Sequence, residues 1–258
     1  MTVDGVWNEI LEIDLRDRAL LEGPQDDLAS ALLSMVSVSV VLPVRNEAQN
    51  LPWVFERMPR GVDEVVLVDG GSTDDTVAVA KEHWQSLVVL HQVGDGKGAA
   101  LMQGFAAATG DVIVMLDGDG STDPAEIPRF VAALLAGADF AKGSRFLAGG
   151  GSADITRVRR LGNAVLASAV NRLWGAKYSD LCYGYNAFWS RCISTVAAQC
   201  RGFEVETLMN IRVARGGLKV VEVPSFEQSR RHGVSNLNAR RDGMRVLRTI
   251  IAERIRPC

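Results

Sequence analysis

The sequence predicts an α/β fold with a mostly parallel central sheet and helices on both of its faces. Strand-like and helix-like segments alternate over residues 36–143, which is the pattern of parallel strands joined by crossover helices. Residues 112–116 are apolar throughout, as expected for a strand that is buried on both faces. Polar clusters follow the strands, so the carboxyl ends of those strands should carry the functional loops.

The first expected strand is residues 36–42, an apolar and β-branched run that Pro43 should end. Apolar residues at helical spacing over residues 51–58 then predict a helix. The following expected strands are residues 64–68, 87–90, 112–116 and 140–143. Helices should separate them, and Asp123 followed by Pro124 is a typical helix start.

The second half of the chain continues the alternation less regularly. Its expected elements are a helix from residue 157, a strand at 183–189, a helix at 204–214, a strand at 219–223, a polar loop at 230–236 and a helix at 239–255. No internal repeat or low-complexity linker divides the chain. We therefore expect a helical extension at residues 1–34 and a single domain over residues 35–258.

The composition is that of an ordinary globular protein. The chain is 47% hydrophobic and 23% charged, and its net charge of −3 gives no general attraction to nucleic acid. The four cysteines show no Cys-X-X-Cys spacing, so free thiols are expected rather than a zinc site. We see no leader and no apolar run of about 18 residues. A cytoplasmic protein is expected, with peripheral contact at the inner face of the cell membrane left open.

The polar clusters that follow the expected strands should meet at one edge of the sheet. They are residues 43–47, 69–74, 95–97 and 117–119. Open α/β sheets bind ligands at this edge. Asp117 and Asp119 form an Asp-X-Asp pair, whose hard oxygen ligands suit Mg²⁺ or Mn²⁺ shared with substrate phosphates. A plain turn with two solvated aspartates is the alternative.

Four of these segments form an ordered set of motifs. They are residues 38–47 (VSVVLPVRNE), 68–76 (VDGGSTDDT), 96–99 (GKGA) and 116–119 (LDGD). Together they resemble family 2 glycosyltransferases of the GT-A fold, over residues 36–236. Residues 143–146 (GSRF), 222–224 (EVP) and 231–237 (RHGVSNL) are similar to later motifs of the polyprenyl-phosphate mannosyl- and glucosyltransferase branch.

The resemblance implies a nucleotide-sugar donor, UDP- or GDP-linked. Pro43, Asn46 and Glu47 would line the nucleotide, with Glu47 near the ribose or base. Asp69 would accept a hydrogen bond from the base edge, and Lys97 would neighbour the nucleotide. The structural alternatives are a first-turn acid for Glu47, a turn residue for Asp69 and a solvated loop cation for Lys97.

The same resemblance implies a divalent cation, Mg²⁺ or Mn²⁺, bound by Asp117 and Asp119, with Asp117 also near the ribose. Arg145 and Arg231 would lie near phosphates, and a structural ion pair is the alternative for Arg145. The chain departs from the branch at residues 120–122, Gly-Ser-Thr, where a glutamine or histidine often completes the metal shell.

The family type implies direct displacement with inversion at the anomeric carbon. A cation and arginines can stabilise the charge that develops on the leaving diphosphate. A polyprenyl phosphate acceptor is already anionic and needs no strong base, whereas a hydroxyl of a soluble glycan or natural product needs a carboxylate. Glu204 and Glu206 are the candidates, and the family's later region favours Glu206.

The location of two helices stays open at this point. The helix at residues 161–174 and the arginine-bearing last helix could lie on an anionic membrane surface or pack in the core.

Other functional classes fit the sequence less well than a glycosyltransferase. Residues 43–46 supply neither the glycine-rich phosphate loop of a nucleotidyltransferase nor the Gly-X-Gly-X-X-Gly of a dinucleotide-dependent oxidoreductase. A non-catalytic sugar-nucleotide sensor would not need both aspartates.

Overall fold

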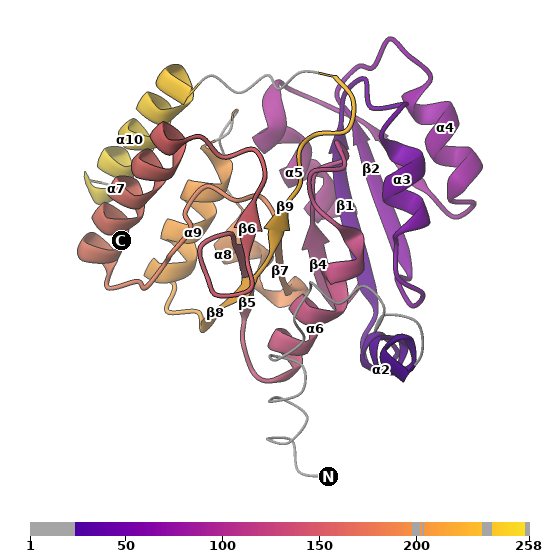
Figure 1. Ribbon diagram of the computed structural model, residues 1–258, viewed down its shortest axis with the longest axis horizontal. Helices are drawn as coiled ribbons and strands as arrows, with labels where there is room; N and C mark the ends of the chain where they lie inside the picture. The colour runs from indigo at the N-terminus through magenta and orange to yellow at the C-terminus, as the bar shows by residue number, and fades with distance from the viewer. Residues whose placement is uncertain (1–23, 198–201, 203, 234–238, 256–258) are drawn as a thin grey trace.

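A seven-stranded sheet forms the centre of the computed structural model, which describes residues 24–197, 202, 204–233 and 239–255 (Figure 1). The strand order is β3-β2-β1-β4-β7-β5-β8, and β7 alone among these runs antiparallel to its neighbours. Helices cover both faces. The predicted mostly parallel α/β sheet is confirmed.

The elements follow the predicted order closely. The strands are β1 Val38–Val44, β2 Glu64–Asp69, β3 Val88–His91, β4 Val112–Met115, β5 Phe140–Ser144, β6 Gly151–Ser152, β7 Asn186–Trp189, β8 Val220–Pro224 and β9 Phe226–Glu227. The helices are α2 Pro24–Leu33, α3 Leu51–Glu56, α4 Thr76–His83, α5 Gly96–Ala107, α6 Ile127–Leu135, α7 Arg157–Trp174, α8 Ile193–Val196, α9 Val205–Arg215 and α10 Ala239–Ile255. Short 3-10 turns, η2 Pro124–Glu126 and η3 Ser190–Cys192, precede α6 and α8.

Pro43 does not end the first strand, contrary to the sequence prediction. The strand β1 continues to Val44, and Pro43 pairs in register with Val68 of β2. The backbone of Val41 faces β4, because its carbonyl accepts from the Leu116 N–H. Alternate residues of a strand face the same neighbour, so Pro43 faces the side where β4 has already ended. Proline has no backbone N–H to donate, but no neighbouring strand lies opposite this position on that side to accept one. The sheet therefore loses no hydrogen bond, and the proline is tolerated.

Two apolar clusters hold helices to the two faces of the sheet. One face packs against α2, α3, α4 and α6, and includes Leu33, Leu51 and Phe130. The other packs against α5, α8 and α9, and includes Phe105 and Met209. Figure 1 shows this three-layer arrangement. Because β1, β2 and β4 are buried on both faces, the sheet is a rigid base for the loops at its carboxyl edge.

A third cluster joins α7, α9 and α10 at one flank of the molecule. At the opposite flank of the molecule, α2 packs against α6, and Leu33 of α2 belongs to the first apolar cluster. Of the extension predicted over residues 1–34, residues 1–23 lie outside the described part of the chain. The boundary between that extension and the domain at residues 35–258 stays a prediction.

Candidate functional site

A cavity of about 810 Å³ lies at the carboxyl ends of β1, β2 and β4, as the converging polar clusters predicted. Predicted residues that line it are Pro43, Glu47, Lys97, Asp117, Asp119, Arg145 and Glu206. The cavity also extends to α7 and α10, which contribute Val158, Leu166, Gly243 and Val246. Asn46, Asp69 and Arg231 are not among the described residues that line it.

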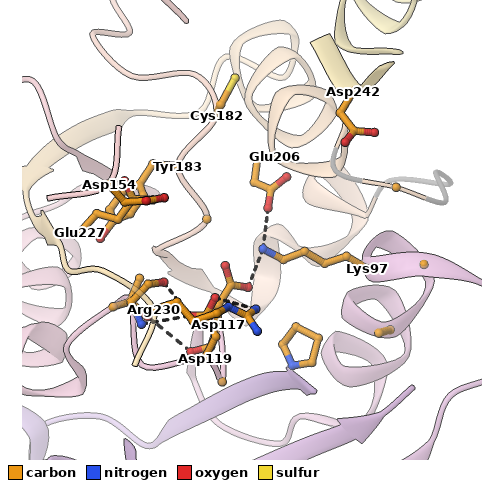
Figure 2. Close-up of a pocket in the computed structure, with 18 of the residues that line it drawn as sticks. Lys97, Asp117, Asp119, Asp154, Cys182, Tyr183, Glu206, Glu227, Arg230 and Asp242 are labelled. Carbon is orange, nitrogen blue, oxygen red and sulfur yellow. Dashed lines mark hydrogen bonds and ion pairs between the residues drawn. The ribbon is translucent and has the colours of Figure 1, made fainter. Parts of the chain in front are cut away.

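Lys97 connects two carboxylates from distant parts of the chain. Its Nζ lies 2.6 Å from Asp117 Oδ1 and 2.8 Å from Glu206 Oε1, as Figure 2 shows. Burial opposes the charged ammonium, but the two carboxylates outweigh it and raise the Lys97 pKa above its ordinary value. Gly184 lies against this trio, and a Cβ there would come within 3.0 Å of Lys97 Nζ. The structure thus excludes the solvated loop cation as the reading of Lys97.

Arg230 connects two further acids of the cavity, Glu47 and Asp119. Its Nη1 lies 3.1 Å from Glu47 Oε1, and its Nη2 lies 3.0 Å from Asp119 Oδ2. The second oxygen of Asp119 accepts from Ser121 N–H at 3.0 Å and from Ser121 Oγ at 2.6 Å. Burial raises the Glu47 pKa, and the Asn50 amide and Arg230 oppose that shift. Glu47 therefore lies inside the cavity as a partnered acid.

Arg231, which the sequence predicted near phosphates, does not line the cavity, and its contact with a phosphate stays a prediction. Its guanidinium carbon stacks over the Trp53 ring, 4.3 Å from the ring centroid, and its side chain covers Gly120. Arg230, its neighbour, is the arginine that reaches the cavity, and sequence reasoning missed it. No local signal separates two adjacent arginines in a polar loop, because the direction of each side chain depends on the fold. Residues 234–236 of that predicted loop lie outside the described chain.

Arg145 is held in a buried ion pair, which was the structural alternative. Its Nε and Nη2 donate to the two oxygens of Asp180 at 2.7 and 3.0 Å, and its Nη1 donates to Glu227 at 3.1 Å. Its side chain is 4% exposed. Such a fork-to-fork pair is strong and directional. The structural alternative is therefore realised, Arg145 also forms part of the cavity wall, and its contact with a phosphate stays a prediction.

Asn46 and Asp69 organise the loops behind the cavity. Asn46 adopts a left-handed backbone, with φ 57°, and its side-chain oxygen accepts from Thr73 N–H at 2.8 Å. Asp69 Oδ1 accepts from Ser72 N–H at 3.0 Å. The Asn46 contact ties the loop after β1 to the loop after β2, and the Asp69 contact is a turn within the second loop. The turn alternative for Asp69 is therefore realised, and a contact of either residue with a nucleotide stays a prediction.

The donor set at Asp117 and Asp119 fits a divalent cation that shares its ligands with a substrate. Both carboxylates line the cavity. Among the described residues, no group of three His, Cys, Asp or Glu side chains is arranged to hold a metal alone. Mg²⁺ typically takes one or two carboxylates and completes its shell with phosphate oxygens and water. Two carboxylates are thus enough for such a cation, and its binding by Asp117 and Asp119 stays a prediction.

The fold and the acid-lined cavity at the carboxyl edge of the sheet are those of a GT-A type glycosyltransferase. The chain belongs to glycosyl transferase family 2, because the model of that family matches residues 39–202. The polyprenol monophosphomannose synthase of Mycolicibacterium smegmatis is 33% identical over 213 residues, which cover 77% of this chain and 80% of that protein. The undecaprenyl-phosphate mannosyltransferase of Micrococcus luteus is 31% identical over 213 residues, covering 78% and 87%.

A solved structure supports the same fold. Glucosyl-3-phosphoglycerate synthase from Mycobacterium tuberculosis, in complex with Mn²⁺, UDP and glucosyl-3-phosphoglycerate, superposes with a TM-score of 0.72 at 25% identity. The match covers 90% of this chain and 85% of the other. The predicted glycosyltransferase family is thus confirmed. No helix in the part of the chain that the structure describes is both long enough and apolar enough to cross a bilayer.

Proposed function

We propose that this enzyme transfers a hexose from a UDP- or GDP-linked sugar to a polyprenyl phosphate, with inversion at the anomeric carbon. The observation that carries the proposal is the pair Asp117 and Asp119 facing a cavity of about 810 Å³ that extends from the sheet edge to α7 and α10. Such a cavity has room for a nucleotide sugar at one end and an acceptor at the other. Relatives that act on polyprenol and undecaprenyl phosphate support this acceptor class.

The chain's own residues supply binding and orientation in this proposal. Pro43 and Glu47 line the end of the cavity that we assign to the nucleotide, and Asp117 and Asp119, which also line it, would hold Mg²⁺ or Mn²⁺. When bound, such a cation stabilises negative charge on the leaving diphosphate. Arg230 and Lys97 place two further positive charges beside the same aspartates. They favour an anionic ligand there and help to offset the charge that develops during transfer.

An acceptor phosphate is anionic at neutral pH and attacks without a strong base. In this reading Glu206, held by Lys97, orients the lysine rather than taking a proton. A second candidate function is transfer to a hydroxyl of a small molecule. Two observations favour it: Glu206 offers a carboxylate inside the cavity, and the chain resembles a synthase crystallised with glucosyl-3-phosphoglycerate. Glu206 would then be the catalytic base.

A donor panel tests the proposal. The protein is incubated with UDP- and GDP-hexoses and Mg²⁺ or Mn²⁺, and nucleotide release is measured alone, with a polyprenyl phosphate and with phosphoglycerate. We expect release from one donor class, stimulated by the lipid phosphate. Stimulation by phosphoglycerate alone would select the hydroxyl acceptor. Failure of every donor to be turned over or bound would contradict the proposed activity.

A further inference from the structure

The outer faces of α7 and α10 expose an apolar surface. The two helices contact each other and α9, and their inner faces bury Val170, Val246 and Ile250. Their outer faces carry large exposed side chains, which are Val158, Leu161, Val165 and Leu173 on α7 and Met244, Leu247, Ile251 and Ile255 on α10. Val158 is 75% exposed and Ile255 is 76% exposed. We call these eight residues the α7–α10 face.

Core packing does not account for this face. On each helix the exposed apolar residues follow helical spacing, at positions 158, 161 and 165 and at positions 244, 247, 251 and 255. They therefore form a stripe that points away from the residues buried against α9. Figure 1 shows α7 and α10 side by side at one flank of the molecule. An apolar stripe on two adjacent helices is typical of an interaction surface.

The exposed charges on the described parts of the two helices are of one sign. The helix α7 holds four arginines and no acidic residue. The acids of α10, Asp242 and Glu253, are both buried. Among the described side chains of the two helices, the exposed charged ones are all arginines, namely Arg157, Arg160, Arg172, Arg241, Arg245, Arg248 and Arg254. This cationic border lies on a chain whose net charge is −3, so it is a local feature.

We propose that the α7–α10 face docks on a membrane surface that contains anionic lipids. An apolar stripe bordered by arginines on helices that do not cross the bilayer is the pattern of interfacial binding, and each arginine near an anionic surface adds attraction. A second copy of the chain fits poorly, because a two-fold contact would bring seven exposed arginines of each copy against those of the other.

Docking in this way would place the cavity beside the lipid. Val158 belongs to the face and also lines the cavity, together with Leu166 from α7 and with Gly243 and Val246 from α10. An acceptor held in a membrane by its polyprenyl chain could then present its phosphate at this end of the cavity. This step rests on the proposed function, whereas the docking itself does not and can be tested without any acceptor.

Vesicle flotation tests the docking directly. The full chain is mixed with phosphatidylcholine vesicles that contain 30% phosphatidylglycerol, about a third anionic lipid, or none, and no polyprenyl phosphate. We expect flotation with the anionic vesicles only, and release when salt is raised to about 0.5 M, where screening is strong. A protein that stays unbound in low salt, or that forms a stable dimer through this face, would overturn the proposal.

Paired variants locate the contact. Leu161→Ser with Ile251→Ser removes part of the stripe, and Arg172→Gln with Arg248→Gln removes part of the charge. Each pair should weaken vesicle binding about tenfold or more. The matched controls are Met35→Ser, which is 67% exposed before β1, and Arg60→Gln with Lys81→Gln, which are exposed near the other end of the sheet. These control variants should bind anionic vesicles as the unsubstituted protein does. An equal loss of vesicle binding in the controls would contradict docking through the α7–α10 face.

Activity measurements separate this inference from the proposed function. None of the four substituted positions lines the cavity, so nucleotide binding and turnover of a short-chain, water-dispersed isoprenyl phosphate should be unchanged in both pairs. Loss of vesicle binding with that turnover intact supports docking through the face. Intact vesicle binding in a protein that turns over no donor would leave the docking supported and the proposed activity contradicted. Unfolding curves confirm that the variants fold.

Discussion

At the scale of single residues, two cations each contact a pair of the acids that line the cavity. Lys97 contacts Asp117 and Glu206, and Arg230 contacts Glu47 and Asp119. These contacts explain how so many carboxylates converge in one partly buried cavity, because an unpaired buried charge is costly. They also mean that each proposed metal ligand already has a cationic partner inside the protein.

Asp119 is the residue whose loss should affect activity most. Asp119→Ala should lower turnover by about 10²–10³-fold, the range seen when one electrostatic contact to a developing charge is removed, and should weaken Mn²⁺ binding. Calorimetric titration with Mn²⁺ and UDP measures the second effect independently of turnover. The control is Asp75→Ala, since Asp75 precedes α4 and makes no side-chain cap hydrogen bond. An unchanged Mn²⁺ affinity in Asp119→Ala would contradict the assignment.

Adjacent arginines give a matched pair of variants. Arg230→Gln removes the cation that contacts Asp119 Oδ2, so Mn²⁺ should bind the nucleotide-free protein about 1.5- to fivefold more tightly, the size expected for one partly exposed ion pair. Arg231→Gln removes only the side chain over Trp53 and should leave the affinity unchanged. Electron paramagnetic resonance of free Mn²⁺ measures both. Equal affinities in the two variants would show that Arg230 does not compete for this site.

At the scale of elements, Glu126 joins the start of α6 to the strand that leads to Arg230. Its carboxylate accepts from Ser225 Oγ and, at 3.2 Å, from Phe226 N–H. Burial raises the pKa of Glu126 to about 7, and its hydrogen bonds and Arg129 only partly offset that effect. Folding therefore favours the protonated form of Glu126 over its carboxylate, relative to the unfolded chain.

This pKa has a consequence for stability as the pH changes. An acid with a raised pKa in the folded state contributes most below its unfolded pKa of 4.5, and the contribution is lost as the pH rises through about 7. The loss should be about 3 kcal/mol. Glu126→Gln mimics the protonated form, so its unfolding free energy should fall less between pH 4.5 and 7. Urea unfolding measures this, with the exposed Glu82→Gln as control, and an unaltered slope in Glu126→Gln would contradict the account.

The close packing of α5 on the sheet depends on a glycine, Gly104, which has no side chain. A methyl group at Gly104 would overlap Val41 Cγ1 and would meet Val68 Cγ2 at 3.2 Å. Gly104→Ala should therefore lower the unfolding free energy by about 1–3 kcal/mol through overpacking. Gly162, inside α7, has no atom within 4 Å of such a methyl, so Gly162→Ala should raise it by about 0.5–1 kcal/mol. Thermal unfolding of both variants checks the opposite signs.

At the scale of the whole molecule, binding at the sheet edge should stabilise the complete fold, because loops from distant parts of the chain line one cavity. At a free UDP concentration about 100 times its dissociation constant, with Mn²⁺ present, the unfolding free energy should rise by about 2.7 kcal/mol. Addition of EDTA should remove most of that gain. Scanning calorimetry measures it, and a nucleotide effect that EDTA does not alter would contradict a shared metal.

The fold and the edge that carries the cavity could be predicted from the sequence because their signals are local. Apolar runs, glycines and acids at strand ends identify the sheet and its ligand edge within a few residues. The partners of Lys97 and Arg145 could not be predicted, since Glu206 and Asp180 lie far along the chain. The choice of Arg230 over Arg231 and the place of Pro43 inside β1 likewise depend on tertiary neighbours.

The position of β7 bears on how the chain assembles. This strand lies between β4 and β5, yet it follows β5 by more than forty residues, since β5 ends at Ser144 and β7 begins at Asn186. During synthesis β4 therefore emerges with one unpaired edge and β5 with two, because β7 and β8 both follow them in the chain. A nascent chain that stalls before Asn186 leaves these edges open to pairing with other chains.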